Sequence, residues 1–565
     1  MSSRGFGFII FLLVAAFFGC FLAYPIWSVL SEAFISSKGK FTLDYIWEIF
    51  RNPLYREGLE NSFWIALGTT LGCLLLSVPL AIVSVRYRFP GKTVLNSLLL
   101  APMILPPFVG AIGVRAMLGQ AGAVNSLLMS LGLMNPDKPT DWLGHGQFYG
   151  VVLMNILHLY PILFLNVSAA LANLDPAMEE AAANLGCPPQ MRFWRITMPL
   201  IMPGLFAGGS LVFIWAFTEL GVPLIFDYTR VTSVQIFNAL KDINGNPYPY
   251  ALVAVMLIAT TVIYLVSKFF FGRSVGLGGG RATTGREDIQ LSKGAGLLCS
   301  GVFALCIFLA ILPHLGVLLL SLSTDWYRTV LPEHLTLQHF NDALSNDLTL
   351  TAVSNSLKYA TLATVLDLVF GIGIAYVCVR TKIWGRQLLD TIAMMPLAVP
   401  GLVLAFGYLS MVRPDRPFHW LMLGENPFFL LVIAYSVRRL PYVVRSATAG
   451  FEQVNVSLEE AAQNLGSSPL QTLKRITLPL IAPNLIAGGL LAFSFAMLEV
   501  SDSLIIAQQA GHYPITKAIY ALVTALGDGP MMAAALGVWA MIFLGVTLLG
   551  ASIILGKKLG TLFRA

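Results

Sequence analysis

The sequence predicts an all-α, polytopic membrane protein with about twelve transmembrane helices in two parallel six-helix repeats. Three observations lead to this prediction. The 565 residues are 56% hydrophobic and only 11% charged, whereas soluble domains carry about 25% charged residues. The chain also contains twelve apolar stretches of roughly the 20 residues that a membrane span needs. Finally, residues 179–209 and 459–489 are identical at 19 of 31 aligned positions, which indicates an internal duplication.

The apolar stretches form two sets of six on either side of a polar segment. This segment, residues 273–293, is rich in glycine and charge and is too hydrophilic to span a membrane. We therefore expect a first half over residues 1–272, a cytoplasmic linker over 273–293 and a second half over 294–565. The predicted spans lie near residues 7–30, 59–85, 94–118, 147–171, 199–222, 250–272, 294–322, 354–379, 388–412, 426–447, 479–503 and 528–555.

The duplication extends well beyond the repeated 31 residues. Pro106 matches Pro400 at an offset of 294, and Glu219 matches Glu499 at an offset of 280. The difference of 14 falls in the external loop between the third and fourth spans, where insertions are tolerated more readily than in spans. Because the halves have equal and even span counts, a pseudo-two-fold axis along the membrane normal should relate them.

Lysine and arginine residues indicate the orientation of the chain. They cluster after the second span of each half, in the repeated segments, in the linker and at the C-terminal end. Cytoplasmic loops are enriched in Lys and Arg, so these segments and both termini should be cytoplasmic. The residues are Arg86, Arg88, Lys92, Arg192, Arg195, Arg273, Arg281, Arg286, Lys293, Arg380, Lys382, Arg386, Lys474, Arg475, Lys557, Lys558 and Arg564.

Two polar islands, residues 175–199 and 455–479, contain the start of the repeated segment. Each island should begin with a short helix, capped by Asp175 in the first copy and by a capping box of Ser457 and Glu460 in the second. Each helix should end at a left-handed glycine, Gly186 or Gly466. A compact helix at the membrane surface would suit a docking partner, and an ordinary cytoplasmic loop is the alternative interpretation.

The islands resemble a known motif. Glu180-Ala181-Ala182, three residues, Gly186, nine residues and Ile196-x-Met198-Pro199 are similar to the EAA loop of permease subunits of binding-protein-dependent ABC importers. The second island repeats this pattern. The resemblance implies a coupling helix that sits in a cleft of an ATP-binding subunit. The residues it assigns to coupling are Glu179, Glu180, Ala181, Ala182, Gly186, Glu459, Glu460, Ala461, Ala462 and Gly466.

The resemblance also implies partners and a location. Two EAA loops imply two ATP-binding subunits, which would hold the ATP and Mg²⁺, while this chain needs no cofactor. A periplasmic or surface-tethered binding protein would deliver the substrate. The permease itself would lie in a bacterial cytoplasmic (inner) membrane. A fused pair of halves resembles the ferric-iron type of permease, with thiamine and aminoethylphosphonate permeases as relatives. The implied substrate is ferric iron or a small anionic, phosphonate-type solute.

Ionisable residues in or near the spans are candidates for the transport pathway, because charges inside a membrane are costly. Glu219, Glu499 and Asp502 lie near the outer ends of spans five and eleven, and the alternative is that they cap the next segment. Arg438, which aligns with His158, lies within span ten. It could contact an anion or pair with Asp367 or Asp390. Snorkelling to the cytoplasmic interface is the alternative, more for Arg445 than for Arg438.

The sequence leaves two other classes of protein open. An ion-gradient-driven secondary transporter with duplicated halves also fits twelve spans in two parallel repeats. A membrane enzyme would need a catalytic cluster, and the sequence contains no Walker A loop, metal-ligand pattern or nucleophile motif. We therefore expect no catalytic site, no metal site and no ATP hydrolysis in this chain alone. The modest net charge of +6 gives no indication of nucleic-acid binding.

Overall fold

The computed structural model describes residues 3–36, 39–144, 147–242, 246–271 and 289–555. Within these ranges ten helices are long and apolar enough to cross a membrane, or eleven if one bent pair counts as a span. The predicted all-α, multi-span fold is confirmed. The predicted span at 426–447 is a helix, α21 (Phe428–Gln453), but three arginines interrupt its apolar sequence. Most of the predicted linker, 272–288, and Lys557, Lys558 and Arg564 lie outside the described residues.

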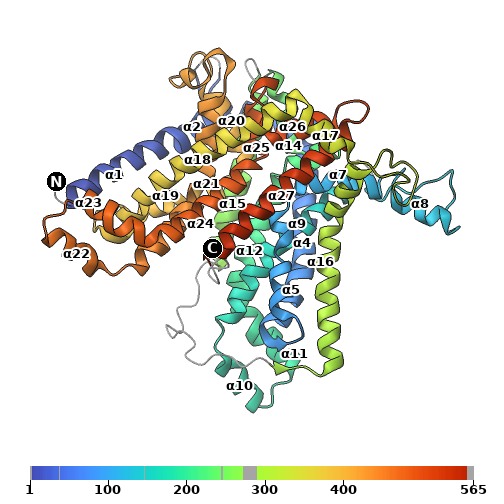
Figure 1. Ribbon diagram of the computed structural model, residues 1–565, viewed down its shortest axis with the longest axis horizontal. Coiled ribbons are helices and arrows are strands. Elements are labelled where there is room, and N and C mark those ends of the chain that lie inside the picture. The colour runs from blue at the N-terminus through green and yellow to red at the C-terminus, as the bar shows by residue number, and fades with distance from the viewer. Residues whose placement is uncertain (1–2, 37–38, 145–146, 243–245, 272–288, 556–565) are drawn as a thin grey trace. The chain divides into compact units, whose positions relative to one another are not determined.

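The long helices and the island helices follow one another in the same order in both halves, while the short elements between them differ (Figure 1). The first half contains α1 (Ser3–Phe18), η1 (Gly19–Ala23), α2 (Tyr24–Phe34), α3 (Asp44–Arg51), α4 (Pro53–Arg86), β1 (Tyr87–Arg88), α5 (Lys92–Leu98), α6 (Ala101–Ile104), α7 (Pro107–Leu118), α8 (Ala123–Ser130), α9 (Phe148–Ala172), α10 (Pro176–Asn184), α11 (Pro189–Arg192), η3 (Phe193–Thr197), α12 (Met198–Phe217), α13 (Gly221–Ile225), α14 (Thr232–Asn238), η4 (Ala239–Asp242) and α15 (Tyr248–Phe271). The second contains β2 (Ile289–Gln290), α16 (Lys293–Leu322), α17 (Gln338–Ser345), α18 (Asp347–Arg380), α19 (Arg386–Ala398), α20 (Gly401–Met411), η5 (His419–Glu425), α21, α22 (Val456–Asn464), α23 (Pro469–Thr472), η6 (Leu473–Thr477), α24 (Leu478–Met497), α25 (Ser501–Ile506), η7 (Ala510–His512), α26 (Ile515–Val523) and α27 (Gly529–Leu555).

The third span of each half is broken, whereas the sequence predicts continuous spans near 94–118 and 388–412. In the first half the stretch forms three helices, and Leu105 between α6 and α7 is extended. In the second half Val399 is extended and α19 and α20 meet at 101°. Pro106 and Pro400 follow the two extended residues directly. A proline disfavours the helical conformation of the residue before it, so the repeated prolines account for both breaks.

The described chain forms two compact units that do not coincide with the two sequence halves. Unit 1 contains Met1–Arg56, Gln235–Leu257 and Leu337–Leu562, and unit 2 contains Glu57–Val234 and Ile258–Thr336. The first spans are therefore exchanged: α1 and α2 pack with second-half helices α18 and α20, and α16 packs against first-half helix α7. In unit 2, β1 also pairs in parallel with β2. The division of the chain at residues 273–293 stays a prediction.

Glycines make the exchanged packing possible. In unit 2, a Cβ added to Gly113 of α7 would lie 2.0 Å from the carbonyl oxygen of Pro313 in α16. In unit 1, a Cβ added to Gly407 of α20 would lie 2.8 Å from the carbonyl oxygen of Pro25 in α2. Within a membrane, small residues let helix backbones approach closely enough for van der Waals packing to hold them together. The same contact thus fixes the exchanged span in each unit.

Replacing Gly113 by leucine should destabilise unit 2 by about 3 kcal/mol or more, because the side chain has no space beside the α16 backbone. Gly301→Leu is a matched control, since Gly301 lies on α16 with no atom within 4 Å of its added Cβ. The measurement is the monodisperse fraction after extraction into mild detergent. Equal recovery of the two variants would show that the close approach is not needed.

Candidate functional site

The two island helices, α10 and α22, have the shape that the sequence predicts, with one correction. Asp175 caps α10 by accepting the backbone N–H of Ala177 at 3.0 Å. Asn455, and not a box of Ser457 and Glu460, caps α22, because this helix starts one residue after the asparagine and one before Ser457. Both helices end at a left-handed glycine, with φ of 78° at Gly186 and 92° at Gly466.

The buried carboxylate of Glu179 connects the first island helix, α10, to α4, which is the second span of the first half. Glu179 is 7% exposed and forms an ion pair with Arg86, the last residue of α4. Thr197, at the end of the π-helical turn η3, donates a hydrogen bond to Glu179, and Arg86 donates to the Thr197 hydroxyl at 3.1 Å. The helix is therefore joined to α4 and to the start of α12 at the same point.

The second island repeats this arrangement in unit 1. Glu459 is 6% exposed, and its carboxylate lies 2.9 Å from Nε of Arg380 at the end of α18 and 2.9 Å from the Thr477 hydroxyl. Arg380 also donates to the carbonyl oxygens of Phe451 and Val454, at 2.8 and 2.9 Å. Two copies of the same buried Arg–Glu–Thr contact show that the duplication preserves the attachment of each island helix.

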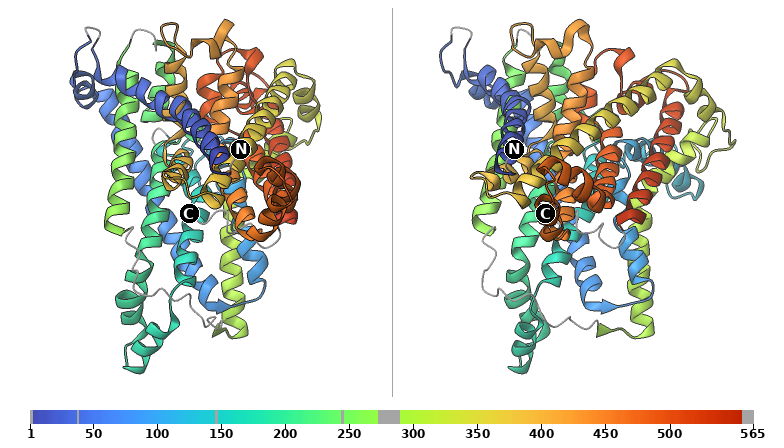
Figure 2. Two further views of the ribbon diagram at one scale, coloured as in Figure 1. Left: turned by 90° about the vertical axis from the view of Figure 1, so that its left-hand side faces the viewer. Right: turned by 60° about the vertical axis from the view of Figure 1, so that its left-hand side comes forward.

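The predicted coupling residues therefore divide into two groups. Glu179 and Glu459 point into the protein, while the neighbouring Glu180, Glu460, Ala181 and Ala461 are exposed. Both left-handed glycines are exposed, and the leucines just before them, Leu185 and Leu465, are each 89% exposed. In unit 2, Figure 2 shows α10 (teal) beyond the ends of the long helices. Each island helix thus presents an apolar, accessible end on a firmly attached base.

The carboxylates Glu219 and Glu499 cap short helices, as one interpretation of the sequence predicts. Glu219 accepts the backbone N–H groups of Gly221 and Val222 at the start of α13, at 3.0 and 3.3 Å. Glu499 likewise accepts the backbone N–H groups at the start of α25. A carboxylate at a helix N-terminus is stabilised by the unpaired N–H groups and the helix dipole. The two glutamates therefore have the same local role.

Glu499 has a second role in unit 1. It is 3% exposed and forms ion pairs with two adjacent arginines of α21, Arg438 (3.4 Å) and Arg439. The matching first-half positions are His158 and Leu159. The partner of Arg438 is thus Glu499, and neither Asp367 nor Asp390 forms a described ion pair with it. Glu499 lies within ion-pair distance of Arg438, although the two residues are 61 positions apart in the sequence.

Asp502 is the least satisfied charged group of unit 1. It is fully buried, and neither carboxylate oxygen has a hydrogen-bond partner among the described residues. Its strongest electrostatic neighbours are Glu499, Arg438 and Arg439. Asp367 of α18 is also fully buried, and it accepts a hydrogen bond of 2.6 Å from the Ser436 hydroxyl. Because Asp367 also interacts electrostatically with Arg439, three buried carboxylates and two half-buried guanidinium groups lie in one region.

His158 and Arg438 both reach the break in the third span of their own unit. In unit 2, Nδ1 of His158 lies 2.9 Å from the carbonyl oxygen of Pro102. In unit 1, Nη1 of Arg438 lies against Gly401, where an added Cβ would come within 1.2 Å of it. The predicted alignment of these two residues is thus matched by their position. Each fourth span places a polar group where the third span is interrupted.

Sequence reasoning missed the lysine next to this region. Lys517 of α26 is 6% exposed, and its ammonium group donates to the carbonyl oxygen of Leu504 in α25 at 2.9 Å. The group also lies over the rings of Phe237 and Tyr513. The sequence does contain a signal that could have identified Lys517, because it is the one charged residue in the apolar run from Ile515 to Val523. The arginines of the island contacts had a clearer signal, since Arg86 and Arg380 are related by the repeat.

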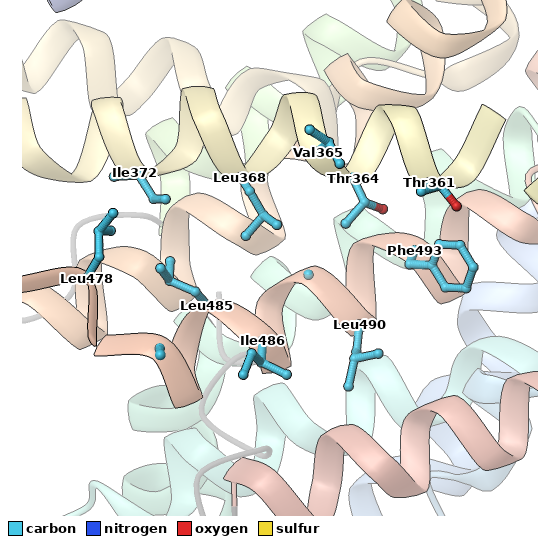
Figure 3. Close-up of a pocket in the computed structure, with 12 residues that line it drawn as sticks. Thr361, Thr364, Val365, Leu368, Ile372, Leu478, Leu485, Ile486, Leu490 and Phe493 are labelled. Carbon is cyan, nitrogen blue, oxygen red and sulfur yellow. The ribbon is translucent and has the colours of Figure 1, made fainter. Parts of the chain in front are cut away.

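An apolar groove of about 560 Å³ runs between α18 and α24 in unit 1 (Figure 3). Its only hydroxyl side chains are those of Thr361 and Thr364, and the rest of its lining is aliphatic or aromatic. It offers no charged group to an ion or a phosphonate. Within the described residues, no group of three or more His, Cys, Asp and Glu side chains could hold a metal ion.

Comparison with known proteins places both repeats in one family. Residues 73–276 and 367–552 each match the binding-protein-dependent transport system inner membrane component. The chain belongs to this family. Both matched segments contain an island. The chain is thus a multi-pass inner-membrane permease of an ABC importer, and a secondary transporter with duplicated halves is not favoured.

Two relatives of this permease match most of its length. A putative ferric transport system permease protein of Haemophilus influenzae is 29% identical over 471 residues, which is 81% of this chain and 70% of the relative. A ferric transport system permease protein of Actinobacillus pleuropneumoniae is 29% identical over 468 residues, 81% of this chain and 64% of the relative. A putative 2-aminoethylphosphonate transport system permease protein of Salmonella typhimurium is 27% identical over 246 residues, 44% of this chain and 85% of the relative.

Proposed function

We propose that this permease carries one docking site for an ATP-binding subunit on each island helix, and therefore binds two such subunits. The observation that supports this proposal is the repeated Arg–Glu–Thr contact. In each unit it holds the island helix firmly from inside, while the glycine end of the helix and its leucine stay exposed. A part that is rigidly attached on one side and apolar on the other is suited to transmit the movement of a partner.

The geometry also gives a route for that movement. In unit 1, Glu459 joins α22 to the end of α18 through Arg380 and to the start of α24 through Thr477. In unit 2, Glu179 makes the matching connections to α4 and α12. A subunit that closes on ATP and pulls one island helix would therefore move two spans of that unit together. Concerted movement of packed helices is a common form of switching between discrete states.

The remaining parts of the proposal concern orientation and partners. Both termini and both island helices would face the cytoplasm, and a substrate-binding protein would dock at the opposite end. ATP and Mg²⁺ would be held by the partner subunits, and this chain would hydrolyse no ATP. The Lys and Arg bias of the loops supports this orientation. Measuring which end of the reconstituted protein a membrane-impermeant protease reaches tests it directly.

For the substrate we propose ferric iron or a small anionic, phosphonate-type solute. The relatives named for ferric and 2-aminoethylphosphonate transport support these two classes, and the half-buried Arg438 beside the third-span break is consistent with an anion or an anion-bound cation. The test is ATPase stimulation in liposomes by binding proteins loaded with ferric iron, phosphonate, sugar phosphate or thiamine. Stimulation by the last two alone would overturn the proposal.

Replacing Gly186 and Gly466 by valine should weaken assembly with the ATP-binding subunits. Each left-handed glycine would be strained by about 1–2 kcal/mol with a side chain, so the end of each island helix would rearrange. No atom lies within 4 Å of either added Cβ, so the core of the permease should be unaffected. The measurement is co-purification with the ATP-binding subunit, together with uptake.

Gly527→Val is the matched control for this pair. Gly527 has φ of 72° and open space around its Cβ, but it lies in the turn between α26 and α27, away from the island helix of unit 1. The control variant should assemble normally. If the double variant also assembled and transported normally, docking at the glycine ends would be wrong.

A further inference from the structure

An arm of residues 119–144 lies between α7 and α9 in unit 2, and the matching loop of the second half is 14 residues shorter by the change of offset. Its helix α8 projects sideways from the long helices of unit 2, far from α10 (Figure 1). The arm links two candidate membrane spans, and the first of them, Pro107–Ser130, includes α8 itself. The composition of this part of the arm is thus compatible with a place at the membrane.

The arm has a fixed shape, set by one buried asparagine. Asn125 is 1% exposed, and its amide nitrogen donates to the carbonyl oxygens of Gln120 and Thr140, at 2.9 and 2.8 Å. Its side-chain oxygen accepts the indole N–H of Trp142 at 2.7 Å. These bonds connect the segment before α8 with the segment after it. A loop held in this way presents a defined surface rather than a changing one.

That surface is apolar and uncharged. Leu127, Leu131 and Leu133 are exposed, the last two by 61% and 73%. No charged residue occurs in the 21 positions from Ala116 to Pro136. A protein-docking surface is usually surrounded by a polar, charged rim, whereas the charged residues within this arm, Asp137, Lys138 and Asp141, are confined to its C-terminal part. Trp142 and Tyr149 are exposed near its base, and aromatic residues of this kind concentrate at membrane–water interfaces.

The end of the matching helix in the second half, α20, is held by ion pairs. At the position that matches Gly119, the second half has Arg413, which lies 3.2 Å from Glu32 of the exchanged helix α2. Arg416 reaches the same carboxylate at 2.6 Å, so a polar ion-pair network closes the end of α20 in unit 1. In unit 2 the corresponding end of α7 carries the leucine surface instead. Charges suit a water-facing turn, and exposed leucines suit lipid.

We propose that the arm is a membrane anchor, whose exposed leucines lie in the interfacial region of the bilayer leaflet opposite the island helices. Apolar side chains of a helix that lies in the membrane plane enter the boundary between headgroups and acyl chains. The anchor holds the end of the broken third span of unit 2, where Arg115 donates to the carbonyl oxygen of Ile225 at 3.1 Å. This role belongs to one half of the permease only.

The test places an environment-sensitive fluorophore on single cysteines in a full-length variant that lacks the six native ones. Leu131→Cys is compared with Lys138→Cys, the matched control at the charged end of the same arm. The permease is reconstituted in phosphatidylethanolamine–phosphatidylglycerol vesicles containing lipids brominated either near the headgroup or near the chain end. We expect several-fold stronger quenching at position 131 than at 138, with shallow bromine more effective than deep.

A second measurement uses the unmodified chain, in case the cysteine-free variant does not fold. Photoactivatable lipid in the same vesicles should label the peptide that contains residues 127–134, as it labels α7 and α9. Two results would overturn the anchor. In the first, the label at position 131 is quenched by iodide and not by brominated lipid. In the second, this peptide carries no lipid adducts while α7 and α9 are labelled. Such a water-exposed arm would point instead to the substrate-binding protein as its partner.

Discussion

Glu499→Gln should destabilise the permease far more than the change to its helix cap alone would. Glutamine keeps an acceptor for the backbone N–H groups at the start of α25, so the helix cap survives in this variant. What Glu499→Gln removes is the charge between Arg438 and Arg439. Removing one partner of a buried ion pair costs about 3–5 kcal/mol, whereas a conserved cap changes by less than about 1 kcal/mol.

Thermal unfolding in detergent and uptake in liposomes measure the difference. Asp502 gives a further check, because it is buried among the same charges without a hydrogen bond. If Asp502 takes over the arginines in Glu499→Gln, then adding Asp502→Asn to this variant should cost more than the sum of the two single changes. A loss of less than about 1 kcal/mol for Glu499→Gln would mean that the arginine pairing contributes nothing beyond the cap.

The features that the sequence predicted well are local or repeated. Asp175 caps its helix and Gly186 takes a left-handed conformation because these preferences depend on a few neighbouring residues. Most of the predicted spans coincide with long apolar helices, because hydropathy reports the length of apolar sequence directly. Even the wrong capping box was close, since Asn455, two residues before Ser457, is an equally good cap.

The features that could not be predicted depend on which helices pack together. The exchange of α2 and α16 rests on the approach of Pro25 to Gly407 and of Pro313 to Gly113. A span exposes apolar side chains to lipid and to other helices alike, so its hydropathy does not identify its neighbour. The same limit applies to Arg438, whose partner Glu499 comes from a distant span, and to Glu179, which looks like a surface residue until Arg86 is placed beside it.

The island contacts lead to the second large effect that we expect. Glu459→Gln should leave the exposed end of α22 intact, because Leu465 and Gly466 do not take part in the buried contact. It should, however, leave Arg380 without its carboxylate, with a stability loss of about 3–5 kcal/mol if the site stays closed. The ATP-binding subunit should still bind, and the substrate transported per ATP hydrolysed should fall, because α22 is no longer held to α18.

The exposed neighbour Glu460 provides the matched control, since Glu460→Gln changes the same charge on the surface of the same helix. A second variant, Arg380→Met with Glu459→Leu, separates stability from coupling. Replacing a buried ion pair by apolar residues of similar volume is often neutral or stabilising, so this double variant should recover the stability that Glu459→Gln loses. If it also recovered the transport yield, packing alone would couple the island helix to the spans. If stability returned without transport, the directional contact of Arg380 with Glu459 and the carbonyl oxygens of Phe451 and Val454 would be the part that carries the movement.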